Sequence, residues 1–314
     1  MHRSASFSSS PSNFSPRVST STGRASRPAR GRNHPSYRVL AIALAGFPLA
    51  AWAQSPPEDI ARERAEFASW LKEAPTSPYR ALVQHPIGRS TTLGPPEADV
   101  PLSGLGLTTI AERGGGLSLT GDGGARPLAR DRVVTLGSYH LLATGLPGGA
   151  VVTVYGAAAG GHPVVAPSYY PYLKAWRSTV ALSPVTKPSV QRILGPDGSE
   201  VEATEAGSVA VMVDGRPVSL RVFRIPAPGG EESEPEIYFR DGTNGKGSYP
   251  AGRFVNLLPA PDGRYVLDLN RARNPFCAYN TVYPCPAPWR GNTIPAPVAA
   301  GERYPGDGLG KPPA

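Results

Sequence analysis

Residues 209–225 read V-A-V-M-V-D-G-R-P-V-S-L-R-V-F-R-I, and this stretch predicts a β-hairpin. In its second half Val218, Leu220 and Val222 alternate with polar residues, which is the pattern of a strand with one buried face. The Asp-Gly pair at 214–215 accepts the positive φ angles of a tight turn between two strands. The stretch therefore favours antiparallel pairing of strands that are neighbours in the chain.

Similar short runs recur along the second two thirds of the chain, at residues 117–120, 132–136, 151–155, 236–240, 253–258 and 265–269. Further Asp-Gly pairs at 197–198 and 262–263 lie between such runs. Parallel strands would need long, usually helical crossovers, and the sequence shows none in this region. We therefore predict a mainly β fold, an antiparallel meander that forms a barrel or a sandwich.

One amphipathic helix is expected before these strands. The sequence S-P-P-E at residues 55–58 has the residue types of a capping box with proline at the first helical position. Ile60, Phe67 and Leu71 then fall on one helical face. We predict a helix over about residues 56–73 that packs on the sheet.

Two features complicate the N-terminal part of the mature chain. Arg64 interrupts the apolar face of the helix, so its charged end must extend away from the core. Residues 76–105 are rich in proline and glycine and weakly periodic, so we expect a long connection there. The expected organisation is a helix with its connection over residues 54–105, followed by a β-rich domain over residues 106–314.

The first 53 residues have the composition of an export signal. Seven arginines and no acidic residue occur in them, and an apolar run from Val39 ends in Ala51-Trp52-Ala53, a small-x-small cleavage pattern. We predict cleavage after Ala53 and a periplasmic or secreted protein with no membrane contact once the signal is removed. A retained anchor and an organellar transit peptide are the alternatives.

The net charge of +8 does not indicate nucleic-acid binding. Removing the seven arginines of residues 1–53 leaves 32 − 7 = 25 basic residues against 24 acidic ones, so the mature chain carries only +1. No stripe of Lys and Arg with interleaved aromatics remains to neutralise phosphates. We expect no nucleic-acid partner. The oligomeric state is not predicted.

Residues 239–302 hold most of the candidate functional groups. The segment begins F-R-D-G-T-N-G-K-G-S-Y-P-A-G-R-F and contains V-L-D-L-N-R-A-R-N-P-F-C-A-Y-N from residue 266. Burying polar groups without partners is costly, so such density beside apolar strands needs an explanation. The ligand-binding candidates are Asp241, Thr243, Lys246, Tyr249, Arg253, Asp268, Asn270, Arg271, Asn274 and Glu302.

Three functions fit this polar block. The first is a small-molecule binding or sensing module in which residues 241–302 form a polar cleft. The second is a hydrolase- or isomerase-type enzyme that uses Asp241 or Asp268 as base. The third is a structural protein in which the block is a buried ion-pair network. Full burial with mutual ion pairs would favour the third, and an exposed carboxylate without a cationic partner would favour the second.

Recognised catalytic and cofactor motifs are absent from the sequence. It contains no G-x-S-x-G, no H-E-x-x-H and no G-x-G-x-x-G after a strand. Residues 242–248 do not match a nucleotide-binding loop, because the glycines are too close and Pro250 follows. We predict no cofactor and no metal, and we assign no catalytic residue.

Cys277 and Cys285 are the only cysteines. An even pair in an exported protein is typical of a disulfide, so a Cys277–Cys285 bridge is predicted. Two free structural thiols are the alternative. Metal binding is weaker, because two thiolates have few histidines to complete a site.

The block also resembles the bacterial and archaeal domain-of-unknown-function family 1684, from Val209 through Glu302. The family motifs run approximately D-x-T-S-G-K-x-x-Y-x-x-G-R-Y, then L-D-F-N-R-A-Y-N-P-x-C-A and C-P-x-P-P, closing on A-G-E. This chain departs from them at Asn244, Phe254, Leu269 and Arg273. The resemblance implies that the polar block defines the family, and it assigns no activity.

Overall fold

The hairpin at residues 209–225 is present and organises the larger sheet. In the computed structural model, which describes residues 55–157, 164–225 and 235–304, strand β13 (Glu200–Val213) pairs antiparallel with β14 (Arg216–Arg224). Asp214 and Gly215 have φ angles of 49° and 74°, as the turn prediction requires. The Asp-Gly turn therefore sets the register of the hairpin.

The meander continues from this hairpin. Strands β15 (Pro235–Phe239), β16 (Arg253–Pro259) and β17 (Tyr265–Asp268) follow in the order β17-β16-β15-β14-β13, all antiparallel, and the sheet forms a half-barrel. Strand β10 (Arg177–Val180) extends one edge, and β11 (Ser183–Pro184) and β12 (Val190–Leu194) pair with β13. The predicted mainly β, antiparallel fold is confirmed.

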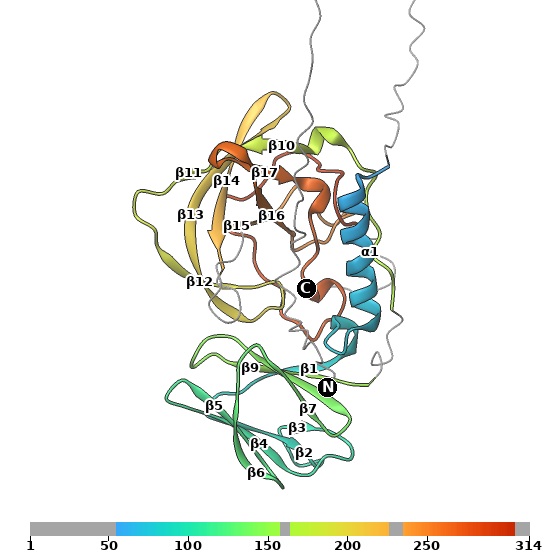
Figure 1. The fold of residues 1–314 in the computed structure, drawn as a ribbon, viewed down its shortest axis with the longest axis vertical. Coiled ribbons are helices and arrows are strands. Elements are labelled where there is room, and N and C mark those ends of the chain that lie inside the picture. Colours follow the sequence, from blue (N-terminus) through green and yellow to red (C-terminus); the bar gives the residue numbers. More distant parts are fainter. Residues whose placement is uncertain (1–54, 158–163, 226–234, 305–314) are drawn as a thin grey trace, which may run out of the picture.

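A second group of strands lies below the half-barrel in Figure 1. It has a four-stranded sheet, β1-β9-β8-β7, and a five-stranded sheet, β3-β2-β4-β5-β6, around its own apolar cluster. The bounds are β1 Ala81–Pro86, β2 Ser90–Gly94, β3 Val100–Pro101, β4 Thr108–Arg113, β5 Gly116–Gly121, β6 Gly124–Leu128, β7 Val133–Leu136, β8 Tyr139–Thr144 and β9 Val151–Tyr155.

The strands β1, β2 and β3 correct the expectation of a connection over residues 76–105. They were hidden because they are short and because threonine takes inward positions: in β2, Thr91 and Leu93 are both buried, whereas a hydrophobic pattern counts only the leucine. Threonine is a favourable strand residue through its branched side chain. Pro/Gly-rich composition therefore concealed short strands here.

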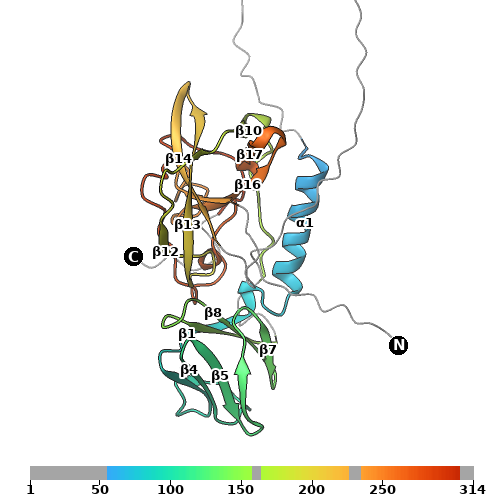
Figure 2. The same cartoon turned by 60° about the vertical axis from the view of Figure 1, so that its left-hand side comes forward.

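The helix α1 (Glu58–Glu73) stands along one side of the half-barrel (Figures 1 and 2). Its buried residues are Ile60, Phe67 and Leu71, as the apolar spacing predicts. The predicted capping box is not formed, because Pro57 occupies the N-cap position and no side chain caps the helix. In the part of the chain that the structure describes, no helix is long and apolar enough to cross a membrane.

Short 3₁₀ turns complete the fold and connect its parts. They are η1 (Pro78–Arg80), η2 (Lys174–Trp176), η3 (Pro261–Gly263), η4 (Leu269–Arg271) and η5 (Phe276–Ala278). The Asn280 side-chain amide donates to the carbonyls of Pro78 and Ala81, at 2.9 and 2.8 Å. The segment after η5 thereby joins the half-barrel to the start of β1.

We expect Gly207→Ala to lower the free energy of unfolding by about 2 kcal/mol or more. Gly207 lies at a bulge in β13 with a φ of 147°, and an added Cβ would meet the backbone of Ser183 in β11. Urea denaturation would measure the change. The matched control is Gly215→Asn, at a positive-φ turn position with open space around it, which should change stability by only a few tenths of a kcal/mol. Equal effects at both positions would contradict the explanation.

Candidate functional site

Arg253 is the most enclosed charged residue of the polar block. Its side chain is 0% exposed, and Nη2 lies 2.8 Å from Oδ2 of Asp241 and 3.0 Å from the carbonyl oxygen of Val298. Nη1 donates to the carbonyl of Ala300. The other Asp241 oxygen accepts from the amide of Thr243 at 2.8 Å and from the amide of Val298 at 3.0 Å. The pair is therefore the centre of a buried network, in which Nε of Arg253 is left without a hydrogen-bond partner among the described residues.

Asp268 and Asn270 form a second buried cluster at the end of β17. One Asp268 oxygen accepts from Arg177 at 3.1 Å, and the other accepts from the amide and the side chain of Asn270 at 3.0 and 2.8 Å. The Asn270 side chain also bonds to both the amide and the carbonyl of Leu173. The cluster fixes the chain before β10 against η4.

Glu302 is buried and makes no ion pair with a described residue, although the charge of Arg273 acts to lower the pKa of its carboxyl group. Its two oxygens accept from the Asn274 amide at 2.9 Å and from the Tyr279 hydroxyl at 2.5 Å. Burial outweighs these hydrogen bonds and raises the pKa of Glu302 to about 7. The carboxyl group therefore titrates near neutral pH inside the fold.

The remaining candidates divide between the interior and the surface. Thr243 is buried and donates its hydroxyl to Asp241 at 2.6 Å. Lys246 is exposed and makes no ion pair to another described residue. Tyr249 is buried, and its hydroxyl lies 3.2 Å from the carbonyl of Cys277 and 3.2 Å from Sγ of Cys285. None of the three lines the pocket described below.

The predicted Cys277–Cys285 disulfide is not formed. Both cysteines are free, and a hydrogen bond between the two side chains lowers the pKa of Cys285 to about 6 while raising that of Cys277. The Tyr249 hydroxyl, 3.2 Å from Sγ of Cys285, contacts the pair where a covalent bridge was expected. Sequence spacing and the expected compartment carried the disulfide prediction, and neither fixes the distance between two sulfur atoms.

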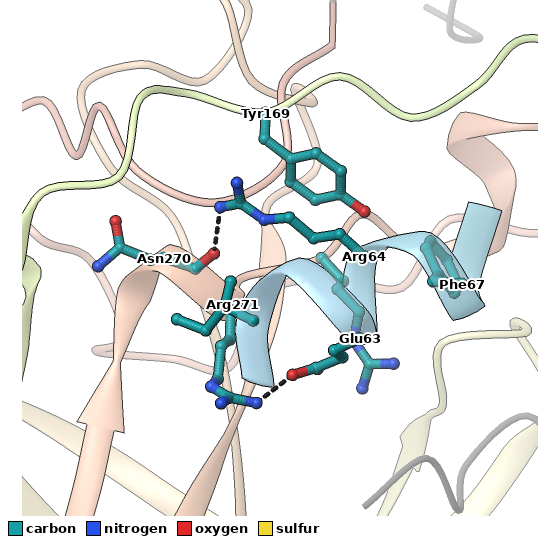
Figure 3. Close-up of a pocket in the computed structure, with 8 residues that line it drawn as sticks. Glu63, Arg64, Phe67, Tyr169, Asn270 and Arg271 are labelled. Atoms are coloured by element: carbon teal, nitrogen blue, oxygen red, sulfur yellow. Dashed lines mark hydrogen bonds and ion pairs between the residues drawn. The ribbon is translucent and has the colours of Figure 1, made fainter. Parts of the chain in front are cut away.

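A pocket lies where α1 meets η4 and the residues that follow it (Figure 3). Its volume is about 20 Å³, which is room for one or two waters or the end of a small ligand. The lining residues are Ile60, Glu63, Arg64, Phe67, Tyr169, Asn270, Arg271 and Arg273. Two of the predicted site residues, Asn270 and Arg271, are therefore brought together at this pocket.

Three arginines line the pocket, and they differ in the partners of their guanidinium groups. Arg271 pairs with Glu63 and with Asp59, the latter at 2.5 Å, so its charge is compensated. Arg64 donates to the carbonyl of Asn270 at 3.1 Å. Arg273 makes no side-chain hydrogen bond or ion pair within the described ranges; its guanidinium carbon lies 5.9 Å from the ring centroid of Phe67.

Burial shifts the charged groups of this pocket. It raises the pKa of Glu63, with Arg271 opposing the shift, and it lowers the pKa of Arg64. The Arg64 guanidinium stacks over Tyr169, with its carbon 4.1 Å from the ring centroid, and Figure 3 shows the side chain extended along that ring. The charged side chains that line the pocket are therefore partly removed from water.

Sequence reasoning missed four of the polar or aromatic pocket residues: Glu63, Arg64, Tyr169 and Arg273. Arg64 carried a usable signal, because a charge on the apolar face of a helix has to meet a polar partner. That partner proved to be Asn270, which is 206 residues away in the chain. No local pattern connects the two segments.

The family whose description is Protein of unknown function (DUF1684) matches residues 166–303. The chain belongs to this family. A solved relative, the solution NMR structure of an uncharacterized protein from Haloarcula marismortui, is 31% identical over 44% of this chain and 76% of that chain, with a TM-score of 0.39. No curated protein matches the chain.

The DUF1684 match covers only part of the pocket. Tyr169, Asn270, Arg271 and Arg273 lie inside residues 166–303, whereas the α1 residues lie before them. Within the described residues no three His, Cys, Asp or Glu side chains gather as a metal site. The candidate site therefore combines a DUF1684 segment with a helix from outside the match.

We expect Arg253→Met to lower the free energy of unfolding by about 3–5 kcal/mol, because it leaves Asp241 buried without its cation. Urea denaturation at neutral pH would measure the loss. Arg192→Met, at an exposed position of β12, is the control and should change stability by less than about 0.5 kcal/mol. A loss below about 1 kcal/mol for Arg253→Met would show that the pair does not stabilise the fold.

The raised pKa of Glu302 predicts a pH dependence of stability. Below about pH 4.5 the carboxyl group is protonated in both states; between about 4.5 and 7 it ionises only in the unfolded chain, so stability falls as pH rises through this window. The total contribution is about 3 kcal/mol. Glu302→Gln, which cannot ionise, should remove this fall.

The measurement is the free energy of unfolding of the wild type and of Glu302→Gln from pH 4 to pH 8. The difference between the two isolates Glu302 from other titrating groups, including Glu63. Parallel curves for the two proteins would mean that the pKa of Glu302 is the same in the folded and unfolded states, and would contradict the raised value.

Proposed function

We propose that this DUF1684 protein is an exported small-molecule binding module whose ligand site is the pocket between α1 and residues 269–273. The observation that carries the proposal is Arg273, a cation at the pocket that makes no side-chain hydrogen bond or ion pair to a described residue, although its charge also acts on Glu63 and Glu302. A buried or half-buried charge without a partner is costly, and a ligand can supply the partner.

The surrounding network supports binding by holding the pocket walls in place. Asn270 is fixed by Asp268 and by Leu173, and Arg271 is fixed by Glu63 and Asp59. Walls that do not have to be ordered on binding reduce its entropic cost. In this proposal the polar block of residues 241–302 supports the site, and only its middle part reaches the ligand.

The alternative functions fit less of the molecule. Asp241 and Asp268 each accept several hydrogen bonds, pair with arginine and do not line the pocket, which disfavours either as a catalytic base. A purely structural role accounts for these two carboxylates and for Arg253. It does not account for Arg273, whose side chain makes no hydrogen bond or ion pair to a described residue.

Export is part of the same proposal. The apolar run before Ala53 and the small-x-small site support cleavage there and a periplasmic or secreted protein. These residues lie outside the part of the chain that the structure describes. A binding module in that location would meet external small molecules.

Methyl NMR tests the binding proposal. Ile60 lines the pocket, whereas Ile87 lies in the separate core of the β1–β9 strands, so the two methyl signals report on different places. The small-molecule fraction of the host's growth medium and periplasm is added to the purified full chain. We expect the Ile60 signal to move and the Ile87 signal to stay.

Two results would contradict the proposal. An unchanged Ile60 signal with every fraction would show that nothing binds at this pocket. Equal shifts of Ile60 and Ile87 would indicate a general effect on the protein instead of a site.

A further inference from the structure

We propose that the pocket takes the carboxylate end of a short-chain organic acid, with Arg273 as its principal ionic partner. This rests on the binding function proposed above and names the ligand class. Three observations carry it: the charge balance at the pocket, an available hydroxyl donor, and apolar walls around a small volume.

The charge balance favours an anion. The lining contains three guanidinium groups, of Arg64, Arg271 and Arg273, against the single carboxylate of Glu63. Glu63 forms an ion pair with Arg271, and Arg271 forms a second ion pair with Asp59. Two guanidinium groups are thus left without a carboxylate within ion-pair distance among the described residues.

Arg273 is the better placed of these two cations. Arg64 already donates to the Asn270 carbonyl and stacks on Tyr169. Arg273 lies beside the ring of Phe67, and its charge also acts to lower the pKa of Glu63 and of Glu302. Its side-chain N–H groups nevertheless make no hydrogen bond or ion pair to a described residue, so they can donate to a ligand. A guanidinium binds a carboxylate through two parallel hydrogen bonds, which gives both strength and orientation.

Tyr169 supplies a neutral donor at the same place. Its hydroxyl makes no hydrogen bond to a described residue, and burial raises its pKa well above the usual value, so it keeps its proton at neutral pH. Figure 3 shows the Tyr169 ring above the Arg64 side chain at the pocket. A protonated hydroxyl beside two cations suits a carboxylate oxygen.

The walls and the volume limit the group that the carboxylate can carry. Ile60, Phe67 and the ring of Tyr169 offer carbon surfaces, which favour a short alkyl group. A phosphate or sulfate has additional charged oxygens, which would face these carbon surfaces without a hydrogen-bond donor. The volume of about 20 Å³ admits only a few non-hydrogen atoms. Acetate and propionate are the matching probes.

The experiment titrates the full chain with acetate, propionate, propionamide and inorganic phosphate, and follows the Ile60 and Ile87 methyl signals. Propionamide has the shape of propionate without its charge. The variant Arg273→Met removes the charge and keeps an unbranched stem against Phe67. Arg192→Met, at an exposed position of β12, removes a charge away from the pocket.

We expect propionate to shift Ile60 and to bind at least tenfold more tightly than propionamide or phosphate. Arg273→Met should weaken propionate binding at least tenfold, and Arg192→Met should leave it within twofold. A circular dichroism spectrum and an unfolding curve of each variant establish that it is folded.

Failure of this inference differs from failure of the binding function. If propionamide binds as tightly as propionate, or Arg273→Met binds propionate as the wild type does, the carboxylate assignment is wrong while binding at the pocket stands. If phosphate binds most tightly, the ligand is an inorganic oxyanion and the apolar walls do not select against it. If no probe shifts Ile60 but a growth-medium fraction does, the ligand class is wrong. If neither does, both proposals fail.

Discussion

The buried ion pair between Arg253 and Asp241 is the constraint on which the rest of the half-barrel depends. A guanidinium with no exposed surface has to find partners for most of its donors, because an unpaired buried charge costs several kcal/mol. Arg253 finds them in one carboxylate and in the carbonyls of Val298, Ala300 and Glu302. A single side chain on β16 thereby ties down a C-terminal segment that belongs to no sheet.

That segment then determines how the residues after β17 are held. Once the chain at 298–302 is fixed, the Glu302 carboxylate meets the Asn274 amide and the Glu302 amide meets the Ala272 carbonyl. Arg273 lies between these two anchored residues. The position of Arg273 at the pocket is therefore a consequence of a network whose anchoring residues, Arg253, Asp241 and Glu302, do not line the pocket.

Local sequence patterns predicted the antiparallel meander, but not that it forms a half-barrel, because the pairing of neighbouring strands is written in local signals. Alternation in β14 and Asp-Gly turns at 214–215 and 262–263 define neighbours in the chain, and the meander pairs neighbours. Local patterns did not predict the short strands before residue 105, because these strands place threonine at buried positions. Nor did they predict the free thiols of Cys277 and Cys285, which depend on the distance between the two sulfur atoms. The pocket was not predicted because it brings together residues that are far apart in the sequence, such as Arg64 and Asn270.

A double-mutant cycle between Asp241→Asn and Arg253→Met tests the central claim, that the buried Arg253–Asp241 pair stabilises the network that holds the site. The free energies of unfolding of the wild type, both single variants and the double variant give the coupling energy directly. We predict a coupling of about 2 kcal/mol or more, because each single change leaves the other charged group buried alone. A coupling below about 0.5 kcal/mol would mean that the two residues stabilise the protein independently, and it would contradict the account.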